Sequence, residues 1–313
     1  MTWTAEDWPI APSLNQFSET PPGAVDATGA GPAVWRPVFR EVRLAGFESF
    51  DAFDSWVRVG DLDDASLASF GRVAGEEGLS ICALSTSRRS PIADDPAIAV
   101  ENLAYLHRAL DAADGLGVRT ICMGLHEPLT RAQVEAQWFW HADGVRNPLD
   151  DGEAYERAVA AFAELGEHAA RLGEVISLEL YEDTYLGDGP SSVRFVHDVG
   201  RENVGLNPDL GNLIRLHRPV EDWRDTLAAM APYTNYWHVK NYIRDVDPAT
   251  GAYFTAPSSL ELGFIDYRAA LRTVLATGYE APICVEQYGG DALSVSATNM
   301  RYLRSLLSQL LAL

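Results

Sequence analysis

Four ionisable residues stand inside apolar runs in the second half of the sequence. Glu179 lies in ISLELYED, Asp209 in GLNPDLGN, His238 in YWHVKN and Glu286 in ICVEQY. Burying such groups is unfavourable unless they are paired or bind a metal. Three carboxylates and one imidazole suit Mn²⁺, with Mg²⁺, Co²⁺ or Zn²⁺ as alternatives. The sequence therefore predicts a divalent-metal site at these four residues, and the competing interpretation is a set of salt bridges inside a barrel.

The spacing of these residues supports one shared site. Glu179 and Asp209 are 30 residues apart, and Asp209 and His238 are 29 apart. Each step is about the length of one strand–helix unit, so the side chains are expected at equivalent heights on successive strands. The step to Glu286 is 48 residues, and an insertion at 245–264 accounts for the excess.

Two further residues are candidates for acid–base or oxyanion chemistry. Lys240 is the single lysine of the chain and stands two residues after His238, so both point to the same face of a strand. A lysine there can stabilise an oxyanion, or it can form a salt bridge at the strand end. His126 shares a face with Gly124 and is either an acid–base group or a hydrogen-bonded core histidine.

Strand and helix periods alternate along the chain. Strands are expected at 10–17, 48–57, 79–86, 118–126, 175–182, 203–210, 235–243 and 281–288. Helices are expected at 63–78, 97–115, 151–172, 191–200, 220–232, 266–277 and 291–312. Eight strands alternating with helices predict an α/β fold, a (β/α)8 TIM barrel, formed by residues 1–313 as one domain. An open doubly wound sheet is the alternative, but no glycine-rich nucleotide fingerprint follows a strand.

Two segments interrupt this rhythm, at about 127–150 and 245–264. Both follow the carboxyl ends of strands, where barrel active sites are built, so they are candidate lids or substrate walls. The first contains Trp138-Phe139-Trp140-His141. Trp140 and His141 are candidate substrate contacts, and His141 is a second candidate for acid–base work. The alternative is that this run packs on the protein itself or on a partner subunit.

The composition excludes several classes of function. The formal charge is −21, which disfavours nucleic-acid binding. No apolar run is long enough for a membrane span. The first twelve residues lack the basic and apolar stretches of a secretory signal, and three widely spaced cysteines do not suggest a disulfide framework. These features predict a cytoplasmic protein with free thiols.

The four ligand positions resemble those of the xylose isomerase-like TIM barrels, the sugar phosphate isomerase/epimerase group. The run LGFIDY followed by GYEAPICVE is also similar to that group, and the resemblance is strongest from 175 to 290. It implies a Mn²⁺-type site, a sugar or glycoside substrate, and Glu179 and Glu286 as the acid–base pair. It also implies that Arg244, six residues after His238, contacts substrate.

Two positions depart from the pattern of ketose epimerases. A substrate-contacting histidine three residues after the strand-six aspartate is replaced by Asn212, a candidate substrate contact here. A second carboxylate six residues after the strand-five glutamate is replaced by Tyr185. Both departures count against plain ketose epimerisation.

The stretches HVKNY, NPDLGN and LYED look more like the catalytic subunits of C-glycoside deglycosidases. That resemblance implies a lyase that cleaves 3-keto-C-glycosides, working in a hetero-oligomer with a small partner subunit. A keto-sugar isomerase or 3-epimerase is the alternative, because all these reactions begin with proton abstraction next to a keto group. A non-catalytic barrel in an assembly would not need the four-ligand set. A nuclease site of this fold would need more histidines and a basic surface.

Overall fold

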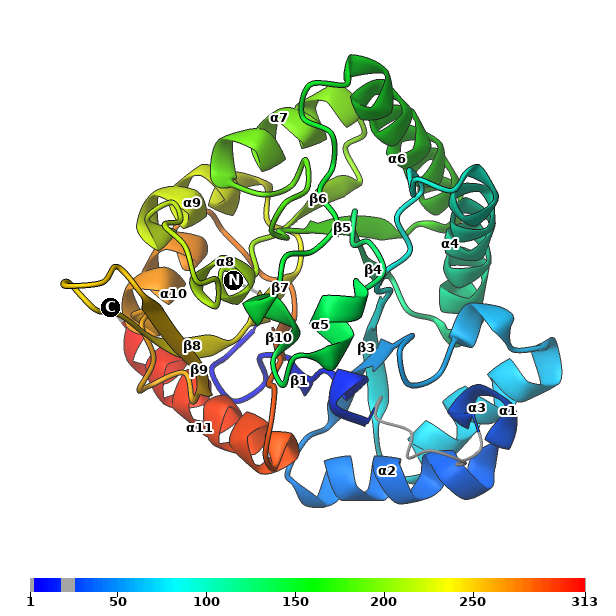
Figure 1. The fold of residues 1–313 in the computed structure, drawn as a ribbon. Coiled ribbons are helices and arrows are strands. Elements are labelled where there is room, and N and C mark those ends of the chain that lie inside the picture. The colour runs from blue at the N-terminus through cyan, green and yellow to red at the C-terminus, as the bar shows by residue number, and fades with distance from the viewer. Residues whose placement is uncertain (1–2, 18–25, 313) are drawn as a thin grey trace.

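The computed structural model describes residues 3–17 and 26–312. Within them, eight parallel strands form the wall of a barrel (Figure 1). The strands are β1 (Ile10–Pro12), β2 (Ser49–Phe53), β3 (Ser80–Ser85), β4 (Thr120–Met123), β5 (Val175–Glu179), β6 (Val204–Asn207), β7 (Trp237–Val239) and β10 (Ile283–Val285). Strands β2 to β6 pair in order, and β7, β10 and β1 pair in order. Parallel bridges Ser13–Asp51 and Leu206–Thr234 join these two groups, so the predicted TIM barrel is confirmed.

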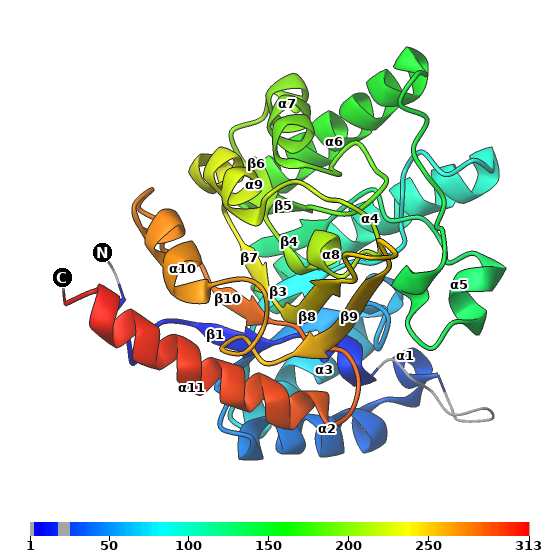
Figure 2. The same cartoon turned by 60° about the vertical axis from the view of Figure 1, so that its left-hand side comes forward.

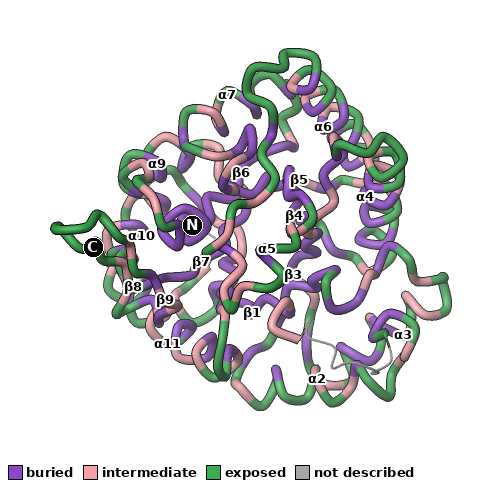
Figure 3. Tube along the Cα trace, in the orientation of Figure 1, coloured by how far each residue is buried: buried purple, intermediate pink, exposed green. Residues whose placement is uncertain are grey.

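Helices surround the barrel (Figures 1 and 2). They are α1 (Ala27–Ala30), α2 (Pro32–Leu44), α3 (Asp64–Glu76), α4 (Pro96–Leu116), α6 (Gly152–Leu172), α7 (Gly189–Val199), α9 (Trp223–Met230), α10 (Tyr267–Leu275) and α11 (Ala292–Leu310). Aspartate side chains cap the amino ends of many of them, and left-handed glycines end α4, α6 and α7. Figure 3 shows the resulting division, with buried residues on the strands and exposed ones on the outer helix faces. No helix in the described part of the chain has the length and apolarity of a membrane span.

Both predicted insertions lie over one mouth of the barrel (Figures 1 and 2). The segment 127–150 holds the short helices α5 (Arg131–Glu135) and η3 (Phe139–His141). The second is not a loop, because its chain forms an antiparallel hairpin of β8 (Asn241–Val246) and β9 (Tyr253–Ser258). The hairpin begins directly after β7, four residues earlier than expected. Helix α8 (Gly211–Ile214) follows β6 and packs against β8.

The three cysteines are free, as expected from their spacing. Cys122 and Cys284 are buried inside the barrel with Ala83 and Tyr236, and Cys82 is half-buried. Burial raises the pKa of both buried thiols well above the usual value. They are therefore packing residues and not thiolate nucleophiles.

One buried carboxyl lies far from the predicted site. Glu174 precedes β5, at the opposite end of this strand from Glu179, and is 1% exposed. Neither of its carboxylate oxygens has a hydrogen-bond partner among the described residues. Burial, with a smaller contribution from Asp114, raises the pKa of Glu174 to about 8.

Glu174→Gln is expected to stabilise the protein more at pH 8 than at pH 5. The unfolded carboxyl ionises near 4.5, whereas the folded one stays protonated until about 8. Stability therefore falls as pH rises through this window, and the substitution removes that loss, about 1–3 kcal/mol at pH 8. Thermal melts at both pH values measure the effect, with exposed Glu167→Gln as the control. Equal shifts in Tm at pH 5 and pH 8 would contradict it.

Candidate active site

The structure brings the four predicted ligands together at the carboxyl end of the barrel. Glu179 is the last residue of β5, Asp209 lies two residues after β6, His238 is in β7 and Glu286 directly follows β10. One ligand atom from each side chain lies within 4.8 Å of those of the others. All four side chains are buried.

The donor set fits a divalent cation. His238 Nδ1 lies 3.5 Å from Glu179 Oε1 and 3.7 Å from Glu286 Oε2. This nitrogen has no hydrogen-bond partner in the described part of the chain. Three carboxylates around one imidazole nitrogen are unfavourable in a buried space unless cations compensate their charge. Oxygen-rich sites of this kind suit Mg²⁺ and Mn²⁺.

Lys240 supplies part of the compensating charge. Its Nζ lies 2.6 Å from Asp209 Oδ2 and 2.7 Å from Glu286 Oε2. Burial lowers the pKa of Lys240, but these two carboxylates outweigh burial and hold the pKa well above its usual value. Gly211 makes room for this side chain, since a Cβ at 211 would collide with Lys240 Cγ. The structure thus places Lys240 at the cluster, where the strand pattern predicts it.

His126 and Asn212 both contact Glu179. His126 Nε2 lies 3.1 Å from Glu179 Oε2, and Asn212 Nδ2 donates to Glu179 Oε1 at 3.1 Å. A Cβ at Gly124 would approach the His126 ring to 2.8 Å, so a glycine is needed there. Burial raises the pKa of Glu179, but His126 and His238 outweigh it and hold the pKa well below its usual value. Glu179 is therefore ionised, as a base or a metal ligand must be.

Two residues of this site were not predicted. Asn15 Nδ2 donates to Glu286 Oε1 at 2.6 Å. Asp51, in β2, is fully buried and lies 3.2 Å from His238 Nε2 through its Oδ2. The same oxygen accepts hydrogen bonds from Tyr236 and Ser85, at 2.8 and 2.7 Å. Asp51 thus orients the imidazole so that Nδ1 faces the carboxylates, the arrangement typical of histidine ligands.

The aromatic run packs on the protein itself, above the cluster. Trp140 is 4% exposed and stacks on Trp138 with ring centroids 5.1 Å apart. Its ring also lies 5.4 Å from that of Tyr242 and 5.5 Å from that of Tyr288. The Tyr288 ring in turn lies 5.4 Å from Lys240 Nζ. Trp140 is therefore one ring removed from the ligand cluster.

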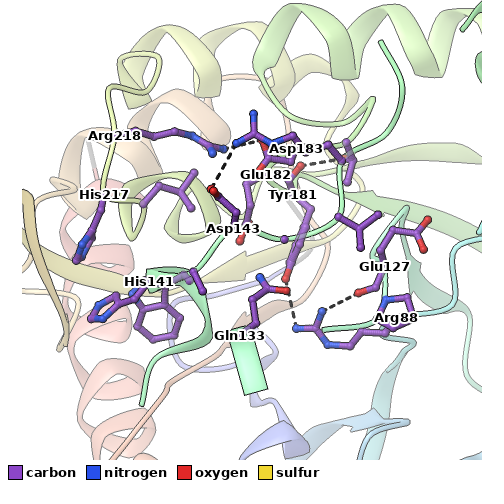
Figure 4. A pocket seen from close by; sticks show the side chains of 18 residues that line it. Arg88, Glu127, Gln133, His141, Asp143, Tyr181, Glu182, Asp183, His217 and Arg218 are labelled. Carbon is purple, nitrogen blue, oxygen red and sulfur yellow. Dashed lines mark hydrogen bonds and ion pairs between the residues drawn. The ribbon is translucent and has the colours of Figure 1, made fainter. Parts of the chain in front are cut away.

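Part of this aromatic run lines a cavity of about 200 Å³, which we call the outer cavity (Figure 4). Its wall includes Trp140, His141, Tyr181 and Glu182, and none of the four ligands lines it. His141 faces His217, with ring centroids 4.3 Å apart. The structure therefore places His141 at the outer cavity and does not support its second predicted role, acid–base work at the cluster.

Comparison with known proteins agrees with this geometry. The model of the xylose isomerase-like TIM barrel matches residues 39–306. The chain belongs to this family. A family member of known structure, from Mycobacterium smegmatis and in complex with magnesium, is 40% identical, with a TM-score of 0.92 over 99% of this chain and 100% of that one.

Two curated relatives of the family are sugar epimerases. D-psicose 3-epimerase of Agrobacterium fabrum is 24% identical over 246 residues, which cover 76% of this chain and 78% of that protein. L-ribulose-5-phosphate 3-epimerase UlaE of Salmonella paratyphi A is 23% identical over 274 residues, which cover 84% and 85%.

Arg244, the residue for which the family resemblance implies a substrate contact, makes hydrogen bonds to the protein backbone. It lies on hairpin strand β8, and its guanidinium donates to the backbone carbonyls of Ile214, Leu216 and Arg218. The ring of Tyr253 covers it at 4.5 Å. The early start of the hairpin carries this arginine out to the end of α8. Three of its N–H groups are used there, and the predicted substrate contact stays a prediction.

Tyr185 occupies the place of the expected second carboxylate. It is buried, and its hydroxyl donates to the carbonyl of Pro148 at 2.8 Å. Its backbone N–H donates to Asn147 Oδ1 at 3.0 Å. This residue therefore anchors the end of the 127–150 segment to the strand-five loop.

Proposed function

We propose that this protein is a divalent-metal-dependent keto-sugar isomerase or 3-epimerase. The observation that carries the proposal is the buried cluster of Glu179, Asp209, His238 and Glu286, with one ligand atom of each within 4.8 Å. The two curated epimerases support epimerisation over the C-glycoside lyase reaction that the sequence motifs favour. The substrate is a small keto sugar.

The four clustered side chains would hold the cation. Mn²⁺ is the ion expected from the sequence, and Mg²⁺ fits the same oxygen-rich donor set. When bound, a divalent cation supplies electrostatic stabilisation for the charge that develops on a sugar carbonyl oxygen as the neighbouring C–H is deprotonated.

The two glutamates divide the proton transfer in this proposal. Glu179 removes the proton next to the keto group. His126 Nε2, 3.1 Å from Glu179 Oε2, stabilises the negative charge of this carboxylate. Glu286 lies on the other side of His238 and returns a proton to the opposite face of the same carbon. Lys240 Nζ, 2.7 Å from Glu286, is the nearest proton source for that step. One C–H bond breaks and one forms, so the sugar is epimerised without a co-reactant.

An NMR time course in D₂O tests this function. The protein, loaded with Mn²⁺ or Mg²⁺, is mixed with free ketoses, ketose phosphates and 3-keto glycosides. We expect deuterium at the carbon next to the keto group together with a new epimer or isomer. Release of an aglycone, without epimer formation, would replace the proposal by the lyase. No exchange on any sugar, with the metal bound, would contradict both.

A further inference from the structure

A buried arginine with unused hydrogen-bond donors lies next to the proposed active site. Arg215 directly follows α8 and is fully buried. Its Nη2 donates to both carboxylate oxygens of Glu182, each at 2.8 Å. Its Nε and Nη1 have no hydrogen-bond partner among the residues that the structure describes. A guanidinium that is buried with free N–H groups is unfavourable unless something else binds them.

Aromatic rings surround the guanidinium of Arg215. Its Cζ lies 4.7 Å from the ring centroid of Phe139, 5.2 Å from that of Tyr181 and 5.5 Å from that of Trp140. Such contacts offset part of the burial of the charge, but ring faces are weak acceptors for N–H groups. The Tyr181 ring also contacts the ring of His126, at 4.4 Å. Arg215 is thus one ring away from the group that contacts Glu179.

The same rings separate the outer cavity from the ligand cluster. Trp140, Tyr181 and Glu182 line the cavity, and Figure 4 shows Tyr181 and Glu182 at its edge. At about 200 Å³ the cavity is smaller than the roughly 300–1,000 Å³ of most ligand sites. Arg215 itself does not line the cavity, so a sugar that reaches the cluster from this side has to displace the rings of Trp140 and Tyr181. The free donors of Arg215 are then available to its oxygen atoms.

The charge of this arginine is already neutralised. Glu182 is itself buried and pairs with Arg215 through both of its oxygens. A second negative group at the same guanidinium would lie close to the Glu182 carboxylate and be repelled. The cavity wall itself carries both signs of charge, since three acidic residues besides Glu182 and three arginines line it, and Asp183 pairs with Arg218 at 2.9 Å. It is therefore Glu182 that disfavours a phosphate, because it already neutralises the guanidinium, and an uncharged oxygen acceptor suits this position better.

We propose that Arg215, held by Glu182, is a specificity residue that binds an uncharged oxygen of the sugar through Nε and Nη1 and selects unphosphorylated sugars over sugar phosphates. The inference rests on the proposed function for the identity of the ligand as a sugar. The two curated epimerases are named for a free sugar, psicose, and for a sugar phosphate, ribulose 5-phosphate. The inference predicts that this protein prefers the free sugar.

Binding of matched sugar pairs tests the inference. Calorimetry on the Mg²⁺-loaded protein compares ketohexoses with their 6-phosphates. We expect the wild type to bind the free sugars at least about tenfold more tightly. Arg215→Gln should weaken free-sugar binding and raise KM about tenfold, with metal affinity unchanged and a smaller effect on kcat. Glu182→Gln should narrow or reverse the preference against the phosphate.

Arg194→Gln is the matched control. Arg194 also stacks on a ring, that of Tyr155 at 4.4 Å, and pairs with Asp198, but it is exposed on the outer helix α7. It should leave sugar binding unchanged. If Arg215→Gln does not fold, wild-type protein with ¹⁵N-labelled arginine supplies the result. The Nε–H signal of Arg215 is assigned as the one that is missing from the spectrum of Arg215→Lys. We expect this signal of the wild-type protein to shift when sugar is added.

The outcomes separate this inference from the proposed function. Tighter binding of the 6-phosphate by the wild type would overturn the inference. The inference would also be overturned if Arg215→Gln epimerised the sugar with an unchanged KM. That result would leave the proposed function intact. Sugar binding that depends on Arg215, without exchange in D₂O, would support the inference and contradict the proposed function. No sugar binding at all would overturn both.

Discussion

Glu286→Gln is expected to lower kcat about 10²–10⁴-fold and to weaken divalent-metal binding in the same protein. The amide removes the negative charge from one of the three carboxylates of the cluster and cannot accept a proton. It also leaves Lys240, which contacts both Glu286 and Asp209, with one acidic partner instead of two. Metal binding and proton transfer should therefore decline together.

Metal content after dialysis and turnover of a keto sugar measure the two effects. Glu167→Gln is the control, because this glutamate is exposed on α6, and its contact with Arg201 is long, at 3.7 Å. The control should retain both metal and activity. If Glu286→Gln also retained both, the assignment of the site would be wrong.

The four clustered residues were predictable because each is an anomaly in its local sequence. An acid or a histidine within a run of Val, Ile and Leu has to be explained by a partner. The near-equal spacing of Glu179, Asp209 and His238 then follows from the barrel itself, since successive strands end at one face. Lys240 was predictable from strand alternation with His238.

Asp51 carries the same local signal, but its role depends on tertiary structure. It stands in ESFDAFDSWV, an aromatic strand, three residues before a second aspartate, Asp54. Its contact with His238 crosses the barrel interior between β2 and β7, strands that do not pair with each other. Nothing in the sequence distinguishes Asp51 from Asp54 as the carboxylate that faces the histidine.

The errors of the sequence interpretation have identifiable causes. Helix α2 is absent from the expected helices because Pro32 and Pro37 interrupt its pattern; the first is tolerated at the helix start and the second lies inside it. The sequence predicts a loop at the hairpin β8–β9, because strand β7 runs almost directly into it. Arg244 consequently lies on a hairpin strand and not in a loop. The importance of Arg215 could not be read from the sequence, since one arginine among 23 carries no local signal of burial.

Asp51→Asn is expected to weaken divalent-metal binding about 10–100-fold and to lower turnover at a fixed, subsaturating metal concentration. The carboxylate accepts from Tyr236, Ser85 and His238 at once, and an amide that presents its nitrogen to them offers a donor instead of an acceptor. His238 then loses the partner that aims Nδ1 at the cluster. Because the ligands themselves remain, excess metal should restore much of the turnover.

Tyr236→Phe separates orientation of the imidazole from packing of the barrel interior. It removes one hydrogen bond to Asp51 but leaves the 3.2 Å contact between Asp51 and His238 Nε2. Metal titration by calorimetry should therefore show a change of less than about threefold for this control. Wild-type metal affinity in Asp51→Asn would exclude the positioning role. Of the two variants, only Asp51→Asn removes the charge next to the histidine. If both variants lost metal affinity equally, the polar network would act on the fold of the barrel interior and not on the orientation of the imidazole.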